Sequence, residues 1–180
     1  MNHRFTLILM ALALIVVLGV TNTEAAPKET VRSVAPPGIY VFTNDGTDWT
    51  PEVLGQYNWW HARGWGTQAK PKTTGPKWVH ISIPIAEMVS LSNMYVETVG
   101  FCARSSNGAG GTGPSRIDIY NDDTLFTTQN ISWWTDNDYH CPTFNLTPTM
   151  FEAVSISLSL NFAHTTDMIT LGMAFVWTAP

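Results

Sequence analysis

One short segment of this chain concentrates side chains that could bind a ligand. Residues 55–66 have the sequence GQYNWWHARGWG, in which three tryptophans, a tyrosine, a histidine and an arginine lie between glycines. A second pair of adjacent tryptophans follows at 133–134. Exposed rigid rings beside hydrogen-bonding groups are typical of sugar and peptide sites, because ring faces stack and polar groups orient the ligand. The candidate binding residues are Trp59, Trp60, His61, Arg63, Trp65, Trp133 and Trp134.

The alternative role for these rings is structural. Tryptophan-rich loops can fold over an open end of a β-fold and close it, and we favour this packed lid for residues 55–66. Adjacent side chains on an extended backbone point to opposite sides, so each tryptophan pair should contribute one buried and one more exposed ring. If a ligand site exists, the five tryptophans should gather at one end of the fold with at least two rings open to water.

Catalytic chemistry has weaker support. The G-x-S-x-G, H-E-x-x-H and P-loop patterns do not occur in the sequence. A glycosidase needs only two facing carboxylates, and Glu97, within an expected strand, is the most interesting carboxylate of the chain. A carboxylate at such a position more often belongs to a solvated outer face. We therefore expect no enzyme, and a small secreted hydrolase is the third alternative for function.

Two oxygen-rich segments, at 121–123 and 135–138, could bind a metal. Calcium takes about six to eight oxygen ligands, and Asp136 and Asp138 are the best-spaced pair to share one. Asp and Asn are also the residues that cap ordinary turns, and we favour that interpretation. We expect no cofactor, with calcium as the metal candidate.

The chain has two cysteines, Cys102 and Cys141. In an exported protein an even pair predicts one disulfide, here between the strands expected at 93–103 and 139–146. A metal site is disfavoured because His140, next to Cys141, would point to the opposite face of a strand.

The beginning of the chain predicts export. Residues 1–25 have the pattern of a signal peptide: a short basic start, the apolar run 5–20 and a small-residue exit. An uncleaved membrane anchor is the alternative, although the apolar run is shorter than the roughly twenty residues that span a bilayer. We expect an extended linker at 26–37 and a β-sandwich domain at 38–180. The mature protein would be secreted, extracellular or periplasmic, without stable membrane insertion.

The charge of the chain limits its partners. The formal net charge is −5, and only 13% of the residues are charged. Such a chain has no basic stripe, which argues against nucleic acid as a partner.

Alternating strands dominate the rest of the sequence. Residues 154–162 place five apolar side chains on one face, and this period of two excludes a helix. In the same way 168–177 predicts an inward set of Ile169, Leu171, Met173, Phe175 and Trp177. We expect these two segments to pair as an antiparallel hairpin, as should 116–120 and 124–128. Trp78 and Trp177 are expected in the core.

The other face of residues 154–162 is polar. It carries a row of short side chains, namely Ser155, Ser157, Ser159 and Asn161. A solvated sheet face is the expected role of this row, and packing against a second copy of the chain is the alternative. Self-association is therefore retained among the partner predictions.

The order of these segments resembles small secreted bacterial all-β proteins of unknown function. The resemblance covers residues 78–178 and rests on WVHISIPI at 78–85, the glycine-rich loop 105–114, IDIYND at 117–122 and the terminal alternating segments. It implies a jelly-roll-like fold and no particular activity.

We predict an all-β protein, an antiparallel β-sandwich or jelly roll with one disulfide. Its predicted function is that of an exported, non-catalytic module that binds carbohydrate or a cell-surface polymer. A self-assembling envelope or extracellular protein is the second alternative.

Overall fold

β-Strands form nearly all of the regular structure in the part of the chain that can be described. The computed structural model of the protein describes residues 40–85, 95–149, 151 and 153–179. All of its strands belong to the unit that spans Val31–Pro180. The predicted signal peptide (1–25) and linker (26–37) lie outside the described residues.

The strands form two antiparallel sheets, sheet A and sheet B. Sheet A has the order β3 (Tyr57–Arg63), β4 (Gly66–Pro71), β11 (Ile169–Ala179), β6 (Tyr95–Ser105) and β9 (Thr143–Thr149), and β1 (Tyr40–Asn44) also pairs with β11. Sheet B has the order β2 (Thr50–Pro51), β5 (Gly75–Ile83), β10 (Val154–Phe162), β7 (Gly113–Asn121) and β8 (Thr124–Asn130). A single 3-10 turn, η1 (Leu54–Gln56), precedes β3 in the described residues.

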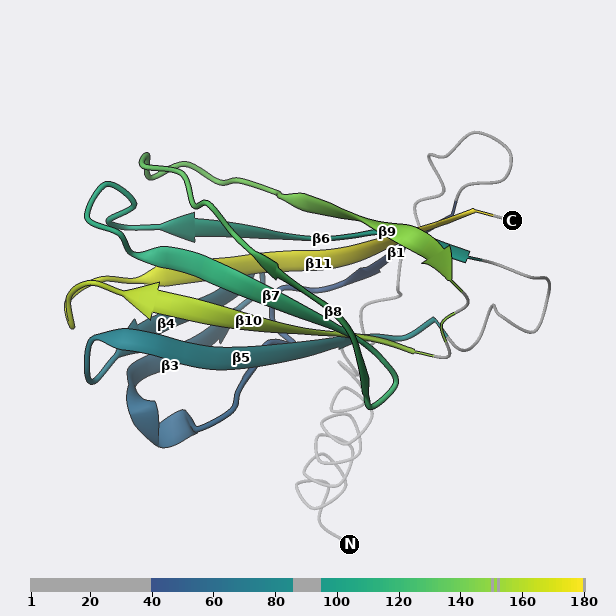
Figure 1. Cartoon of the computed structure of the whole chain (residues 1–180). Helices are drawn as coiled ribbons and strands as arrows, with labels where there is room; N and C mark the ends of the chain where they lie inside the picture. The colour runs from purple at the N-terminus through teal and green to yellow at the C-terminus, as the bar shows by residue number, and fades with distance from the viewer. Residues whose placement is uncertain (1–39, 86–94, 150, 152, 180) are drawn as a thin grey trace, which may run out of the picture. The chain divides into compact units, whose positions relative to one another are not determined.

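The connections between the strands are those of a jelly roll. From β4 onward the chain crosses from one sheet to the other at every connection except the one between β7 and β8. The resulting orders, β4-β11-β6-β9 and β5-β10-β7-β8, are those of two interleaved Greek keys. Figure 1 shows the strands of both sheets running along the same long axis. The predicted fold class, an antiparallel β-sandwich or jelly roll with one disulfide, is confirmed.

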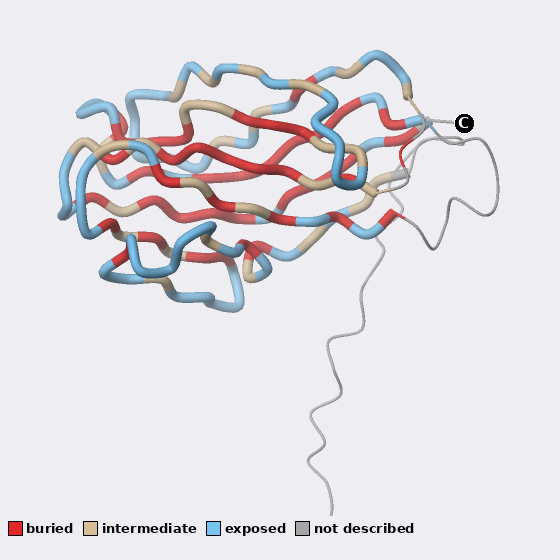
Figure 2. The backbone as a smooth tube through the Cα atoms, turned by 60° about the horizontal axis from the view of Figure 1, so that its bottom comes forward, coloured by how far each residue is buried: buried red, intermediate tan, exposed pale blue. Residues whose placement is uncertain are grey.

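The core lies between the two sheets. On β10 the alternating apolar side chains are all at most 1% exposed: Val154, Ile156, Leu158, Leu160 and Phe162. They face apolar side chains of sheet A such as Val99, Phe101 and Val176 in one hydrophobic cluster. Figure 2 shows this burial concentrated along the middle of the strands, with exposed residues in the turns. The inner faces are thus filled by apolar residues, which leaves the two outer faces for other roles.

The expected hairpin between the last two strands is wrong. β10 pairs with β5 and β7 in sheet B, whereas β11 pairs with β1, β4 and β6 in sheet A. The short link between them crosses the sandwich, because each strand finds its hydrogen-bonding partners among distant segments. The hairpin expected at 116–120 and 124–128 is confirmed as β7 and β8.

The inward set predicted for β11 is correct only in its first part. Ile169 and Leu171 are buried, but a β-bulge between Leu171 and Ala174 shifts the register. Beyond the bulge the inward side chains are Ala174, Val176 and Thr178. Trp177 is therefore 43% exposed on the outer face of sheet A, instead of lying in the core.

Trp78 also lies outside the core. It precedes the buried Val79 on β5 and points to the outer face of sheet B, where the Arg116 guanidinium lies 5.3 Å from its ring centroid. The alternation of β5 explains this placement, because Trp78 shares a side with His80.

The predicted disulfide is confirmed. The Sγ atoms of Cys102 and Cys141 are bonded at 2.05 Å. Cys102 lies on β6, and Cys141 lies just before β9, the neighbouring strand of sheet A. Within the described residues no helix is long and apolar enough to span a membrane.

Candidate functional site

The β3–β4 hairpin presents its polar and aromatic side chains outward in alternation. Trp59 is 45% exposed, and its ring centroid lies 5.2 Å from that of His61 on the same face. Arg63 follows two residues further on the same side of the strand. Trp60 points the other way, packs against the core and meets the ring of Tyr57 at 4.9 Å. Only the first tryptophan of this pair is thus available to a ligand.

The turn of this hairpin carries the most exposed tryptophan of the candidate site. Trp65 is 54% exposed and lies in a shallow depression lined also by Arg104 and Tyr139. Gly66 holds the turn close to β11, since its φ is 150° and a Cβ there would lie 2.3 Å from the Leu171 carbonyl oxygen. Only glycine fits this position, so the approach of Trp65 to the sheet is a property of the local sequence.

The register of sheet A places Arg104 in line with the hairpin. His61 lies opposite Gln68, and Gln68 lies opposite Thr170. Thr170 in turn lies opposite Arg104 on β6. Because neighbouring strands are about 4.8 Å apart, this row extends for about 14 Å across four strands. It is exposed at His61 and Arg104, whereas Thr170 between them is 1% exposed.

Tyr139 comes to the same depression from the segment between β8 and β9. The Arg104 guanidinium lies 5.4 Å from its ring centroid, within the range of a cation–π contact. Tyr139 is 43% exposed, and partial burial raises the pKa of its hydroxyl against the opposing effect of Arg104. Paired backbone hydrogen bonds between Ala103 and His140, each 2.9 Å, hold this segment beside β6. Three separate parts of the chain therefore build the depression.

The second tryptophan pair is fixed in the same segment. Trp133 packs against the core, and its ring lies where a side chain at Gly113 would be. Trp134 is 37% exposed and stacks on His140, with ring centroids 4.2 Å apart and planes 1° from parallel. Each pair thus has one partly buried and one exposed ring, as the alternation predicted. Trp59, Trp65 and Trp134 are open to water.

The candidate calcium ligands are exposed. Asp136 accepts hydrogen bonds from His140 Nε2 and from the backbone N–H of Asp138. The His140 contact, followed by that N–H, holds the pKa of the Asp136 carboxyl below its ordinary value. Among the described residues no group of three or more His, Cys, Asp and Glu side chains is arranged to hold a metal ion. The arrangement at Asp136 is that of a capped turn.

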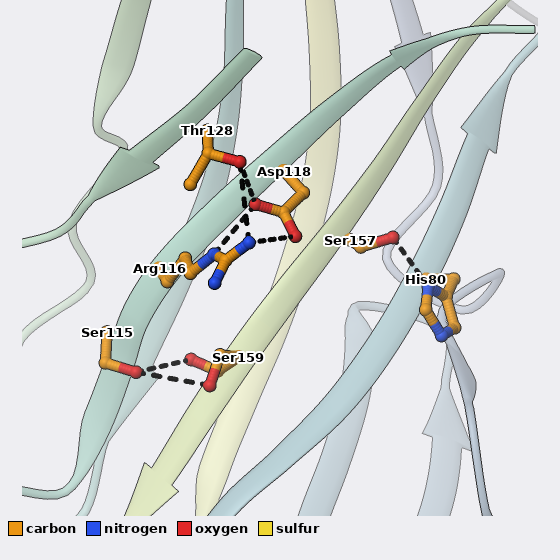
Figure 3. Close-up of polar contacts among 7 residues, drawn as sticks. All are labelled: His80, Ser115, Arg116, Asp118, Thr128, Ser157 and Ser159. Carbon is orange, nitrogen blue, oxygen red and sulfur yellow. Dashed lines mark hydrogen bonds and ion pairs between the residues drawn. The ribbon is translucent and has the colours of Figure 1, made fainter. Parts of the chain in front are cut away.

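The outer face of sheet B carries a different kind of surface, which Figure 3 shows. Asp118 accepts hydrogen bonds from Arg116 Nε at 2.9 Å and from Thr128 Oγ1 at 2.7 Å. On the neighbouring strand the Ser157 hydroxyl lies 2.7 Å from His80 Nδ1. The serine row of β10 is therefore bonded to the strands on both sides, and Asp118 and Ser157 are each 6% exposed. The polar groups of this face are already paired with one another.

The serine, histidine and aspartate of this face do not form a catalytic triad. In a triad the carboxylate orients the histidine, which in turn contacts the serine. Here Asp118 lies on the far side of Ser157 and binds Arg116 and Thr128. No carboxylate among the described residues contacts His80, so the arrangement supports no hydrolysis by this route.

The glycine-rich loop also has no nucleotide-binding context. The spacing of Gly108, Gly110 and Gly113 matches G-x-G-x-x-G. That pattern cradles a pyrophosphate when it joins a strand to a helix, and here it joins β6 to β7.

The fold places the candidate residues predicted from the sequence in different parts of sheet A and its loops. Trp59, His61 and Arg63 lie outward on β3, and Trp65 lies beside Arg104 and Tyr139, which sequence reasoning missed. Trp177, also missed, adds an exposed ring to the outer face of sheet A on β11, and its ring centroid lies 6.0 Å from that of Phe175, which is 8% exposed. Only the strand register reveals these residues, because they are distant in the sequence.

Comparison with known proteins found similar solved structures but no family. No family model matches the chain, and a search of curated proteins found no match. Among solved structures, the carbohydrate-binding module CBM36 in complex with calcium and xylotriose is similar, at 14% identity and a TM-score of 0.43, over 73% of this chain and 96% of that one.

Two further solved structures of this kind are similar. The CBM36-1 domain of a multidomain xylanase from the hindgut metagenome of Trinervitermes trinervoides has 11% identity and a TM-score of 0.45, over 77% of this chain and 95% of that one. A family 29 carbohydrate-binding module from Piromyces equi has 6% identity and a TM-score of 0.42, over 77% and 91%. These likenesses concern the fold, so the function is argued from the site.

Proposed function

We propose that this protein is an exported, non-catalytic binding module whose ligand is a carbohydrate or a cell-surface polymer. The observation that carries the proposal is the depression at Trp65, Arg104 and Tyr139. Two exposed rings from different parts of the chain meet there beside a guanidinium. Rings offer apolar faces to a sugar, and charged or amide groups orient its hydroxyls.

The remaining candidate residues have roles that follow from their positions. Trp59 and His61 continue the outward surface along the edge strand β3, and Arg63 adds a donor near the turn. Trp60 and Trp133 are partly buried and pack against the core, and the Trp133 ring contacts that of the exposed Trp134. Trp134, stacked on His140, is a further exposed ring on the segment that carries Tyr139. The outer face of sheet A is thus the proposed binding face.

Export is supported by the disulfide and by the predicted signal peptide at 1–25. Disulfides persist in oxidising compartments, which include the bacterial periplasm and the extracellular space. The mature protein would act there without stable membrane insertion and without nucleic acid as a partner. The self-assembling alternative would use the flat outer faces of the sandwich and would show concentration-dependent association without ligand.

A glycan-array screen of the purified protein tests the proposal, with and without calcium. Trp65→Ala removes the most exposed ring of the site, and Leu125→Ala, at a side chain 50% exposed on β8, is the matched control. We expect binding to selected glycans that falls by about tenfold in Trp65→Ala, the loss of one stacking contact, and is unchanged in Leu125→Ala. Calcium dependence would assign a metal to the site.

Two results would contradict the proposed function. If neither the protein nor either variant binds any glycan, or if Trp65→Ala only lowers the melting temperature, the tryptophans act as a lid and the proposal fails. Sedimentation at increasing protein concentration would then test self-assembly.

A further inference from the structure

The hairpin that carries the candidate site has positive charge, although the chain as a whole is acidic. The net charge is −5, yet no Asp or Glu occurs between Glu52 and Glu87. That stretch contains four cations: Arg63 and Lys70 lie on the β3–β4 hairpin, whereas Lys72 follows β4 and Lys77 lies buried on β5 of sheet B. It includes the whole β3–β4 hairpin, on which Lys70 lies directly opposite Trp59. The aromatic edge of sheet A is therefore a cationic region on an anionic protein.

Arg104 adds a further cation to this face, and within the described ranges no carboxylate forms an ion pair with it. The ion pairs among the described residues join Arg116 to Asp118 and His140 to Asp136. The Arg104 guanidinium instead lies over the Tyr139 ring, in the depression that it shares with Trp65. An exposed guanidinium between two rings can form two parallel hydrogen bonds to a carboxylate or a sulfate.

One acidic residue of the neighbouring loop, Asp136, is hydrogen-bonded within its own turn. It is bound by His140 and by the Asp138 backbone N–H. The charge of Arg104 acts on the nearby Tyr139 hydroxyl and opposes the rise in its pKa that burial causes.

We infer that the outer face of sheet A binds an anionic polysaccharide, whose carboxylate or sulfate groups pair with Arg104 while its sugar rings stack on Trp65 and Tyr139. The inference rests on the proposed function and specifies its ligand. The row from His61 to Arg104 spans about 14 Å, and its exposed ends, His61 and Arg104, give such a chain a polar track, whereas Thr170 within the row is 1% exposed. The cations of the hairpin complement the charges of the ligand along that track.

Matched charged and neutral polymers test the inference. Polygalacturonate is compared with its methyl ester, and heparin with desulfated, carboxyl-reduced heparin, by calorimetric titration against the full-length protein. Alginate and hyaluronan serve as further carboxylates, and xylan, galactan and dextran as neutral polymers. We expect at least one anionic polymer to bind at least tenfold more tightly than its neutral counterpart. The pair that shows this difference identifies carboxylate or sulfate as the recognised group.

Variants of Arg104 assign the effect to this site. Arg104→Gln should weaken binding of the anionic polymer by about tenfold, the loss of a charge-assisted hydrogen bond. It should leave binding of any neutral polymer unchanged. Arg104→Lys keeps the charge without the fork and should give an intermediate affinity. Lys72→Gln, which removes one positive charge beyond the end of β4, should change the affinity no more than about twofold.

Each contrary result has a separate meaning. Equal binding of anionic and neutral polymers, with Arg104→Gln unaffected, overturns this inference and leaves the proposed function intact. Equal weakening by Arg104→Gln and Lys72→Gln also overturns it, because only net charge would then matter. Failure of every polymer to bind overturns the proposed function as well.

Discussion

The two outer faces of this sandwich both belong to antiparallel sheets, but they differ in how many side chains remain free to contact a ligand. On sheet B the polar groups are hydrogen-bonded to one another, as in the pairs of Asp118 with Arg116 and of Ser157 with His80. On sheet A, Trp65 and Tyr139 remain exposed and Arg104 has no carboxylate partner among the described residues.

This difference separates a structural face from a binding face. A fully paired polar network rigidifies the sheet that carries it and has little left to offer a ligand. Exposed rings leave apolar surface in contact with water, and such patches are typical of an interaction site. Substitutions on sheet B should therefore change stability without changing affinity, and the aromatic face of sheet A should show the opposite.

The largest effect is expected from the disulfide, which lies on the binding side. Loss of the Cys102–Cys141 bond, which closes a loop with a sequence separation of 39, should lower the free energy of unfolding by about 4 kcal/mol in the chain-entropy model. It should also weaken ligand binding, because Cys141 anchors the segment that carries Tyr139. Urea unfolding of a Cys102→Ser, Cys141→Ser variant measures the first effect, and titration of its folded form the second. An unchanged unfolding midpoint would contradict this account.

A smaller effect, confined to stability, is expected from Asp118 on sheet B. Asp118→Ala leaves Arg116 and Thr128 without their acceptor and should cost roughly 2 kcal/mol. The cost stays below that of a fully buried pair because the Arg116 side chain is 43% exposed and can reach water. Asp123→Ala, at an exposed carboxylate in the β7–β8 turn, is the control. A parallel loss of ligand affinity in Asp118→Ala would move the binding face to sheet B.

The smallest effect concerns Asp167, which joins the ends of both sheets. Its carboxylate accepts hydrogen bonds from the Thr112 hydroxyl, the His164 backbone N–H and Asn107. Burial raises its pKa, but these hydrogen bonds outweigh burial and hold the pKa below its ordinary value. The stability that the Asp167 carboxylate contributes is therefore fully present above the unfolded pKa of about 4, and it is lost as the pH falls below that value.

Melting temperatures between pH 7 and pH 3 measure this contribution. Asp167→Asn should lower stability by roughly 1 kcal/mol at pH 7 and flatten the acid dependence. An equally steep loss below pH 4 in the variant would assign the acid sensitivity to other carboxyl groups.

More of the fold than of the candidate site could be predicted from the sequence. Alternation in 154–162 predicts a strand and its buried face correctly, since every second residue is apolar. The same logic fails on β11 because the bulge at Gly172 reverses the alternation, and no local pattern announces it. The Trp49 indole N–H, which donates to the Gly172 carbonyl at 2.7 Å, binds this bulge from a distant part of the chain.

The candidate site was predictable only in its local part. The alternation of Trp59, Trp60 and His61 follows from the extended backbone and is visible in the sequence. Arg104 and Tyr139 join Trp65 through strand register and through the bridge between Ala103 and His140. Such non-local pairings depend on the jelly-roll connections, which the sequence alone leaves open.

Chemical-shift mapping tests most directly the claim that sheet A is the binding face. Backbone amide shifts of the isotopically labelled protein are recorded during titration with the glycan that binds best on the array. We expect the largest changes in amide chemical shift in β3, β4 and β6 and around Trp65 and Tyr139. The amide shifts of β5, β7 and β10 in sheet B should stay unchanged. Changes concentrated at His80, Asp118 and Ser157 would place the ligand on sheet B and contradict the account.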